Sequence, residues 1–183
     1  PLTLIGLNRP VIDARKKGEN ILIESDNVTV KGFKIINSGQ DEVKSVAAIH
    51  IMSASYVKIE DNILENNHFG IYSQLVFKTL IQNNKITTNR GTSQENIGDG
   101  IHNLGCSEMW IKNNFISGHK DGIYLEKTKK SFVYRNLSRK NLRYGLHFMF
   151  ANDCVYSANV FDNNNAGIAV MYALNIGMSD NKF

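Results

Sequence analysis

The sequence has little of what would mark a zinc knuckle, a membrane anchor or a nucleic-acid-binding surface. Its two cysteines, Cys106 and Cys154, lack the CxxC spacing of a zinc knuckle. No run approaches the roughly 18 apolar residues that a membrane-spanning helix needs. Lys and Arg number 21 against 17 Asp and Glu, a net charge of +4 that is mild beside the dense basic stripes of nucleic-acid binders. We therefore expect no membrane span, no nucleic-acid partner and two buried free thiols, with a disulfide as the alternative.

The length and the two ends of the chain suggest one domain taken from a longer protein. At 183 residues the chain has the size of a single domain, which we place over residues 1–183. The first residues, PLTLIGLNRPVID, lack the basic, apolar and small-residue order of a secretory signal. The chain also begins and ends inside a repeat unit. We therefore expect a fragment of a longer repeat protein.

No segment keeps the 3.6-residue apolar period of a helix, and a repeat of about 22 residues takes its place. A small residue precedes a short apolar strand at Ala48, Gly70, Gly100, Gly122, Gly145 and Gly167. The steps between these positions are 22, 30, 22, 23 and 22 residues. An asparagine series keeps the same steps at Asn62, Asn84, Asn114, Asn136, Asn159 and Asn181. Two independent series with equal steps indicate a solenoid.

Each repeat unit contains several short strands that are joined by Asn, Gly and Asp turns. Such a unit cannot bury its apolar face alone, so it must stack on its neighbours. The pattern predicts an all-β fold, a right-handed, single-stranded parallel β-helix with coils of about 22 residues. A leucine-rich repeat has a similar period, but its Leu-rich return is missing here. We expect the asparagine series to be structural, with side-chain amides bonding to the next coil.

Two insertions interrupt the same corner of the coil. The 30-residue step has an extra eight residues near TTNRGTSQEN, and a similar excess lies near SGQDEVKSV. Both come just before the strand that follows the small residue. We expect them to protrude beside the outer face of that strand, and insertions on one face of a solenoid commonly mark its binding side.

Strand alternation predicts which side chains of this strand face inward and which face outward. The inward ladder is Ile49, Ile71, Ile101, Ile123, Leu146 and Ile168. The second position faces outward and contains His50, Tyr72, His102, Tyr124, His147 and Ala169. The fourth position also faces outward and contains Met52, Gln74, Leu104, Glu126, Met149 and Met171. His147 and Met149 should therefore share the outer face, with Met171 about 4.8 Å away on the next coil.

Exposed thioethers beside an imidazole suggest a copper site. Methionine is a soft ligand that suits Cu(I), and histidine accepts copper in either oxidation state. We predict His147, Met149, Met171 and His102 as candidate ligands for copper that is bound transiently. The alternative is that Met149 and Met171 cover hydrophobic surface beneath a loop or a partner. We expect His50 and His68 to be surface or hydrogen-bonded residues.

A second group of residues supports a different chemistry. Asp99 and Asp121 each precede a glycine and fall on adjacent coils. Two carboxylates about 5 Å apart could serve a retaining glycosidase or hold a calcium ion. The simpler interpretation is that Asp before Gly is favourable turn chemistry.

A basic run crosses the fourth and fifth coils. It contains Lys127, Lys129, Lys130, Arg135, Arg139, Lys140 and Arg143. Such a run is usually a solvated edge that prevents strand pairing, and it could instead steer an acidic partner.

The segments HKDGIYLE, NLRYGLHFMF and NAGIAVMYALNIGMSDNKF resemble the NosD family of periplasmic maturation factors for nitrous oxide reductase. The most specific part is RYGLHFM together with GIAVMY, which contain His147, Met149 and Met171. The resemblance implies a right-handed parallel β-helix that is exported to the periplasm. It also implies partners, namely ABC transporter components and nitrous oxide reductase or a copper chaperone, and a protein without catalytic activity of its own.

Two rival functions stay open at this point. The first is a carbohydrate-active β-helix protein, that is, a polysaccharide lyase, a hydrolase or a binding module that uses Asp99 and Asp121. The second is a purely structural, adhesin-like solenoid.

Overall fold

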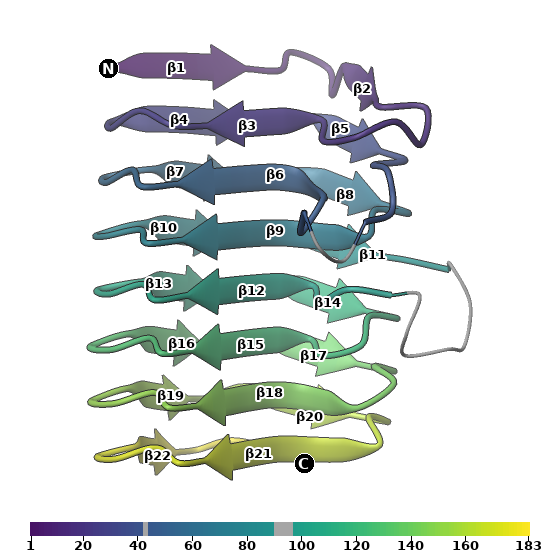
Figure 1. The fold of residues 1–183 in the computed structure, drawn as a ribbon. Helices are drawn as coiled ribbons and strands as arrows, with labels where there is room; N and C mark the ends of the chain where they lie inside the picture. Colours follow the sequence, from purple (N-terminus) through teal and green to yellow (C-terminus); the bar gives the residue numbers. More distant parts are fainter. Residues whose placement is uncertain (42–43, 90–96) are drawn as a thin grey trace.

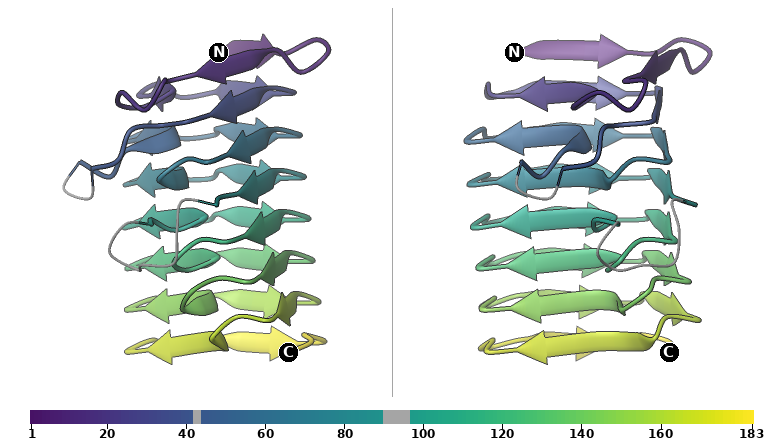
Figure 2. Two further views of the ribbon diagram at one scale, coloured as in Figure 1. Left: turned by 90° about the vertical axis from the view of Figure 1, so that its right-hand side faces the viewer. Right: turned by 45° about the vertical axis from the view of Figure 1, so that its right-hand side comes forward.

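The computed structural model describes residues 1–41, 44–89 and 97–183, and in these ranges the chain forms a stack of coils built from strands and turns (Figure 1). Every strand pairing within the three sheets is parallel, and each coil contributes one strand to each sheet in turn. This arrangement is a parallel β-helix, which confirms the predicted fold. Two further views show the coils stacked in register from the N-terminal to the C-terminal end (Figure 2).

The three sheets are named A, B and C. Sheet A contains β1 (Leu2–Ile5), β4 (Val28–Lys31), β7 (Lys58–Glu60), β10 (Leu80–Gln82), β13 (Trp110–Lys112), β16 (Phe132–Tyr134), β19 (Val155–Ser157) and β22 (Gly177–Ser179). Sheet B contains β2 (Val11–Asp13), β5 (Lys34–Ile36), β8 (Ile63–Glu65), β11 (Lys85–Thr87), β14 (Phe115–Ser117), β17 (Leu137–Arg139) and β20 (Val160–Asp162). Sheet C contains β3 (Ile21–Ile23), β6 (Ala47–Met52), β9 (Phe69–Gln74), β12 (Ile101–Leu104), β15 (Ile123–Glu126), β18 (Tyr144–Met149) and β21 (Ala166–Met171).

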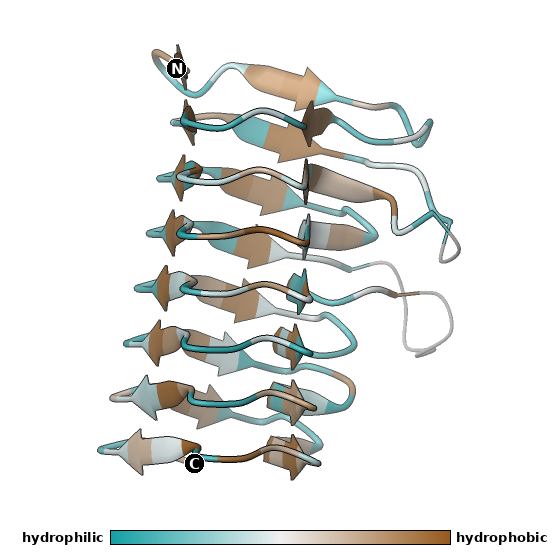
Figure 3. Cartoon of the chain, turned by 60° about the vertical axis from the view of Figure 1, so that its left-hand side comes forward, coloured by the Kyte–Doolittle hydropathy of each residue, from teal (hydrophilic) through white to brown (hydrophobic). Residues whose placement is uncertain are grey.

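Sheet C carries the predicted inward ladder. Its register aligns the ladder residues Ile49, Ile71, Ile101, Ile123, Leu146 and Ile168 across consecutive strands. The first five are fully buried, and Ile168 is partly buried against the same core. Hydrophobic residues concentrate in the strands, and the turns are mostly hydrophilic (Figure 3). The core is therefore one continuous apolar column enclosed by the three sheets.

The asparagine series forms a buried ladder, as predicted. The Asn114 side chain donates from Nδ2 to the Ile81 carbonyl at 3.0 Å and to Asn136 Oδ1 at 3.0 Å. Its own Oδ1 accepts from the backbone N–H and the Nδ2 of Asn84 at 3.0 and 3.1 Å. The same bonds recur from Asn62 to the end of the series at Asn181. Because each amide bonds to the coils on both sides, the ladder sets the register of the stack.

The glycine series has a steric cause. A Cβ on Gly122 would lie 2.6 Å from the carbonyl oxygen of Gly145 on the next coil, and it would overlap the Ser138 hydroxyl. Gly100 and Gly145 face the same obstacle, the carbonyl of the following glycine at 2.6 Å. The backbones of adjacent coils come so close here that a side chain on this inner corner would separate them.

The structure describes most of the first predicted insertion and little of the second. Residues 42–43 in SGQDEVKSV and residues 90–96 in TTNRGTSQEN lie outside the described residues. Ser45 of the first insertion lines a pocket with Tyr72 and His102 of the outer face of sheet C, as predicted. The position of the second insertion stays a prediction.

The two cysteines are free and buried, as the sequence indicated. Burial raises the pKa of the Cys106 thiol to about 12 and also raises that of Cys154. Both sulfurs lie near backbone carbonyls inside the coil, for example Cys106 Sγ at 3.4 Å from the Ser73 oxygen. Neither thiol has the lowered pKa of a reactive cysteine.

Candidate functional site

Histidine and tyrosine alternate along the outer face of sheet C. The register stacks His50, Tyr72, His102, Tyr124 and His147 on five consecutive strands. Neighbouring ring centroids along this column lie 5.1, 4.9, 4.5 and 4.3 Å apart. The rings therefore pack against one another as a continuous column, which is called the His/Tyr column below.

Each histidine of the column is paired with a carboxylate. His50 Nδ1 lies 2.5 Å from Glu19 Oε1, and His147 Nδ1 lies 3.0 Å from Asp121 Oδ2. His102 Nδ1 lies 3.0 Å from Asp99 Oδ2. The sequence predicted exposed imidazoles on this face, but His147 is only 2% exposed. The correction has a physical reason, since the stacked rings and the paired carboxylates cover one another.

His147 has its two ring nitrogens in different environments. Burial opposes ionisation of Asp121, but hydrogen bonds from His147 and Arg143 outweigh it and lower the Asp121 pKa. An ionised carboxylate only accepts hydrogen bonds, so His147 Nδ1 carries the proton. Arg143 donates to the same carboxylate at 2.8 Å through Nε and at 2.5 Å through Nη2. His147 Nε2 is buried and has no hydrogen-bond partner among the described residues. In the neutral imidazole this nitrogen presents a lone pair.

Met149 and Met171 occupy the positions that the sequence predicted. They are direct partners in the register of β18 and β21, with His147 two residues before Met149 on the same face. Both thioethers are half-buried. The Tyr124 hydroxyl donates to Met149 Sδ at 3.2 Å. Burial raises the Tyr124 pKa, so this phenol stays protonated and remains a donor. The structure thus brings His147, Met149 and Met171 onto two adjacent strands.

His102 does not join these three residues. It lies on β12, with the whole of β15 between it and β18. Its Nε2 lies 3.4 Å from Glu126 Oε2, so both nitrogens face carboxylates. Burial disfavours the charged imidazolium, but Asp99 and Glu126 outweigh it and raise the His102 pKa to about 9. A protonated imidazole has no lone pair for a metal, so His102 is a poor ligand at neutral pH.

The predicted carboxylate pair is close together, but each member is occupied. The Asp121 backbone N–H donates to Asp99 Oδ1 at 3.0 Å, which is the turn chemistry that the sequence suggested. Asp99 faces His102, and Asp121 is fully buried beneath Arg143 and His147. A pocket of about 220 Å³ opens beside Asp99 and is also lined by His102, Lys120, Tyr124 and Arg143.

Two signals in the sequence could have found the missing parts of this site. The alternation of His and Tyr at one position of the repeat indicates ring stacking. The pairing of Asp121 with Arg143, which is 22 residues further on, follows the repeat length. The contact of the Tyr124 hydroxyl with Met149 was not predicted from the sequence.

Within residues 1–41, 44–89 and 97–183, no three His, Cys, Asp or Glu side chains converge as a metal site. No helix in these ranges has the length and apolarity to cross a membrane.

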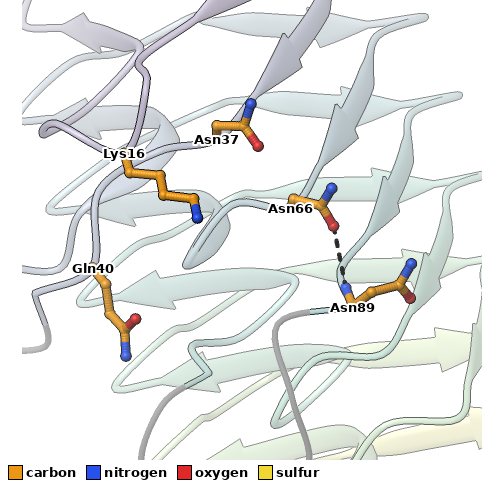
Figure 4. A pocket seen from close by; sticks show the side chains of 5 residues that line it. All are labelled: Lys16, Asn37, Gln40, Asn66 and Asn89. Atoms are coloured by element: carbon orange, nitrogen blue, oxygen red, sulfur yellow. Dashed lines mark hydrogen bonds between the residues drawn. The ribbon is translucent and has the colours of Figure 1, made fainter.

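A second pocket, of about 590 Å³, lies at the turns that follow sheet B (Figure 4). It is lined by Lys16, Gln40 and three asparagines, Asn37, Asn66 and Asn89. The Asn89 backbone N–H donates to Asn66 Oδ1 at 3.3 Å. This pocket contains none of the residues that the sequence singled out.

The basic run is distributed over several faces of the two coils. Arg139 pairs with Asp162 at 3.0 Å, and Arg143 belongs to the outer face of sheet C. Lys127, Lys129 and Lys130 are exposed in the turn between sheets C and A. The run is therefore not one patch.

Comparison with known proteins supports the fold and gives a lead on function. A family model described as a right-handed β-helix region matches residues 48–183. The probable ABC transporter binding protein NosD of Pseudomonas aeruginosa is 25% identical over 112 residues, which cover 61% of this chain and 26% of that protein. The chain thus spans about a quarter of that relative.

Solved structures with the same coil architecture include proteins of different activities. The periplasmic alginate epimerase AlgG has a TM-score of 0.75 at 13% identity, over 91% of this chain and 43% of that chain. An alginate lyase from Paenibacillus has a TM-score of 0.65 at 12% identity, over 97% and 80%. The Streptococcus pneumoniae adhesin PfbA has a TM-score of 0.51 at 12% identity, over 88% and 67%. At these identities the likeness concerns the fold alone.

Proposed function

The chain belongs to the right-handed β-helix family, and from that premise we propose that it is an exported, non-catalytic accessory protein that passes copper to a reductase. Its similarity to a NosD protein, which is named for binding an ABC transporter, supports such a transporter as its partner. By the same resemblance its further partner is nitrous oxide reductase or a copper chaperone. Copper is cargo in this proposal.

The proposal depends on the register of β18 and β21. Their pairing makes Met149 and Met171 neighbours across the sheet, with His147 on the same face of β18. Strands in a sheet lie about 4.8 Å apart, so two thioethers on adjacent strands can converge on one ion by rotating about their side-chain bonds. Thioethers select Cu(I) over harder ions.

The environment of His147 is typical of a histidine that binds a metal ion. Metal-binding histidines usually donate their second ring N–H to a carboxylate, which fixes the orientation of the ring. His147 makes this contact with Asp121 at 3.0 Å, and its Nε2 has no partner among the described residues. A weak site that is partly covered suits a protein that gives up its ion.

The test is an anaerobic Cu(I) titration against a coloured competing chelator. We expect one equivalent to bind, and Met149→Ala and Met171→Ala each to weaken binding about tenfold or more. Met52→Ala is the matched control, because Met52 occupies the same strand position on β6 beside Gln74. Unchanged affinity in the Met149 and Met171 variants, or an equal loss in the control, contradicts the proposal.

X-ray absorption at the copper edge gives an independent readout. We expect sulfur and nitrogen scatterers together, and loss of the sulfur shell in the Met149→Ala, Met171→Ala double variant. A copper centre with only oxygen and nitrogen neighbours would place the ion elsewhere.

A carbohydrate-directed function is the second candidate, and the pocket beside Asp99 favours it. Lys120 offers positive charge there, and Tyr124 offers a hydroxyl. His102 and Arg143 also line the pocket, with their charge balanced by Asp99, Glu126 and Asp121. Such a set suits an acidic sugar. Uronate and neutral oligosaccharides would be incubated with the protein, and activity that Asp99→Asn abolishes would favour this function over copper transfer.

A further inference from the structure

The outer face of sheet A has an exposed apolar stripe. Leu80, Trp110, Phe132 and Val155 are direct partners on β10, β13, β16 and β19. Trp110 is 47% exposed, and Phe132 and Val155 are each 38% exposed. The rings of Trp110 and Phe132 are stacked, with centroids 4.5 Å apart. A contiguous row of exposed large apolar side chains often marks an interaction surface.

A hollow lies on each side of Trp110. One, of about 350 Å³, lies between Tyr56, Leu80 and Trp110. The other, of about 210 Å³, lies between Trp110, Phe132 and Val155. Two hollows around an exposed tryptophan can accept apolar side chains from a partner, and aromatic anchors of this kind dominate binding energies.

The stripe is bordered by more positive than negative charge. The basic residues are Lys58, Lys78, Lys112, Lys130 and Arg135. The acidic residues are Glu60, Glu108 and Asp153. Glu108 is paired with Lys78 at 4.0 Å, and Glu60 and Asp153 accept hydrogen bonds from the neutral amides of Gln82 and Asn175 and keep their charge. The five basic residues still outnumber these three carboxylates by two. Charge complementarity therefore favours an acidic partner.

The spacing of the stripe indicates the shape of the partner. Adjacent strands lie about 4.8 Å apart, and one turn of an α-helix rises about 5.4 Å. Apolar residues at every third or fourth position of a helix therefore match successive rows of the stripe. An extended peptide repeats one face every 6.6 Å or so and soon falls out of step. Strand addition is also excluded, since the stripe lies on the face of a sheet and not on its edge.

We propose that the outer face of sheet A docks an acidic amphipathic helix of a partner protein, with Trp110 between two of its apolar side chains. Sheet A lies behind sheet C in Figure 1, so this face points away from the His/Tyr column. Docking there would leave Met149 and Met171 uncovered. The docking proposal does not depend on copper binding.

The single tryptophan of the chain reports on this face directly. The probe is a 15-residue synthetic helix with Leu at every third or fourth position and Glu at most others. We expect a saturable blue shift of Trp110 emission that weakens at high salt. A peptide of the same composition in scrambled order, and one with Lys in place of Glu, should bind at least tenfold more weakly.

Val155→Glu keeps Trp110 and puts a negative charge, the same sign as that of the peptide, into one of the two hollows. We expect it to weaken the peptide at least tenfold and leave the Cu(I) titration and the circular dichroism unchanged. Leu75→Glu is the control, since Leu75 is 62% exposed in the turn after β9 and lines neither hollow. If Val155→Glu perturbs the fold, Lys130→Glu tests the charge requirement alone.

Several outcomes overturn the proposal. One is the absence of a saturable shift, and another is equal binding of the acidic, basic and scrambled peptides. Dimerisation in sedimentation experiments that Val155→Glu abolishes would assign the face to a second copy of the chain. A shift caused by oligosaccharides and not by the peptide would assign it to sugar.

Discussion

Tyr124 contacts both Met149 and His147. Its hydroxyl donates to the Met149 sulfur at 3.2 Å, and its ring stacks on the imidazole of His147 with centroids 4.3 Å apart and an interplanar angle of 5°. One side chain thus orients a proposed soft ligand and a proposed nitrogen ligand. The hydroxyl also withdraws electron density from the sulfur, which weakens the sulfur as a donor to a metal.

Tyr124→Phe should therefore strengthen Cu(I) binding by about fivefold, the equivalent of one hydrogen bond of roughly 1 kcal/mol. The ring and its stacking remain, so His147 keeps its position. Competition titration under anaerobic conditions measures the change. Tyr156→Phe is the matched control. The Tyr156 hydroxyl also donates to a methionine sulfur, Met178 Sδ at 2.9 Å, but this pair is not part of the proposed site. Weaker binding in Tyr124→Phe would mean that the hydroxyl supports the ion.

His102 should make the stability of the fold depend on pH. Its folded pKa of about 9 lies above the unfolded value of 6.5, so its contribution is complete below pH 6.5 and is lost as pH rises through about 9. The hydrogen bond from His102 lowers the pKa of Glu126, so that residue contributes above its unfolded value of 4.5. The contribution of the pair is therefore largest between about pH 4.5 and 6.5. The shift of His102 alone corresponds to about 3 kcal/mol.

Urea unfolding at pH 6 and pH 9.5 measures this dependence, and proton NMR measures the midpoint of His102. His102→Gln should remove most of the loss of stability between these two pH values. Glu126→Gln should move the midpoint of His102 downward, because one of its two carboxylate partners is gone. A His102 midpoint near 6.5 in the native protein is the result that contradicts this assignment.

The repeat explains why so much of the fold could be predicted. The Gly series marks where the backbones of adjacent coils come close together, as at Gly122. The Asn series marks where a side-chain amide bonds to a neighbouring coil, as at Asn114. Both requirements recur once per coil. Alternation then gave the correct face for Leu146 and His147. The burial of His147 could not be predicted in this way, since it depends on Asp121 and Tyr124 from the preceding coil.

The exposed stripe on sheet A was not predicted, because its residue types are those of a core. Aromatic and β-branched residues in short strands suggest a core, and Trp110 and Phe132 fit that pattern. Only the three-dimensional structure shows that the second residue of each strand, such as Ile111, points inward. On β13 and β16 the inward position therefore holds Ile111 and Val133, and the aromatic Trp110 and Phe132 face outward. On β19 the order is reversed, with Tyr156 buried and Val155 exposed.

Asn114→Ala should destabilise the stack markedly. The variant loses the bonds to Ile81 and Asn136 and leaves buried polar groups of Asn84 without an acceptor. Each buried unsatisfied group costs about 1–3 kcal/mol, so we expect a loss of roughly 3 kcal/mol or more. Chemical denaturation measures it. Asn89→Ala removes an exposed asparagine and should change stability by less than about 0.5 kcal/mol, and equal losses in the two variants would refute the structural role of the ladder.

Asp121→Asn should weaken copper binding although none of the proposed ligands is replaced. An ionised Asp121 makes His147 carry its proton on Nδ1, which leaves Nε2 open. An asparagine can donate to Nδ1 instead, and the proton then moves to Nε2 and blocks it. We expect the Cu(I) affinity to fall about 10- to 100-fold, in line with other residues that orient a metal ligand. Because the buried partner of Arg143 also becomes neutral, stability should fall by about 2 kcal/mol.

Long-range ¹⁵N NMR of the imidazole distinguishes this cause from general damage, since it shows which ring nitrogen is protonated. We expect the proton on Nδ1 in the native protein and on Nε2 in Asp121→Asn. Asp99→Asn is the matched control, because it breaks the contact with His102 and leaves the pairing of His147 intact. If Asp99→Asn lowers copper affinity as much as Asp121→Asn does, with the His147 tautomer unchanged in both, then Asp121 acts on the fold and not on the ligand.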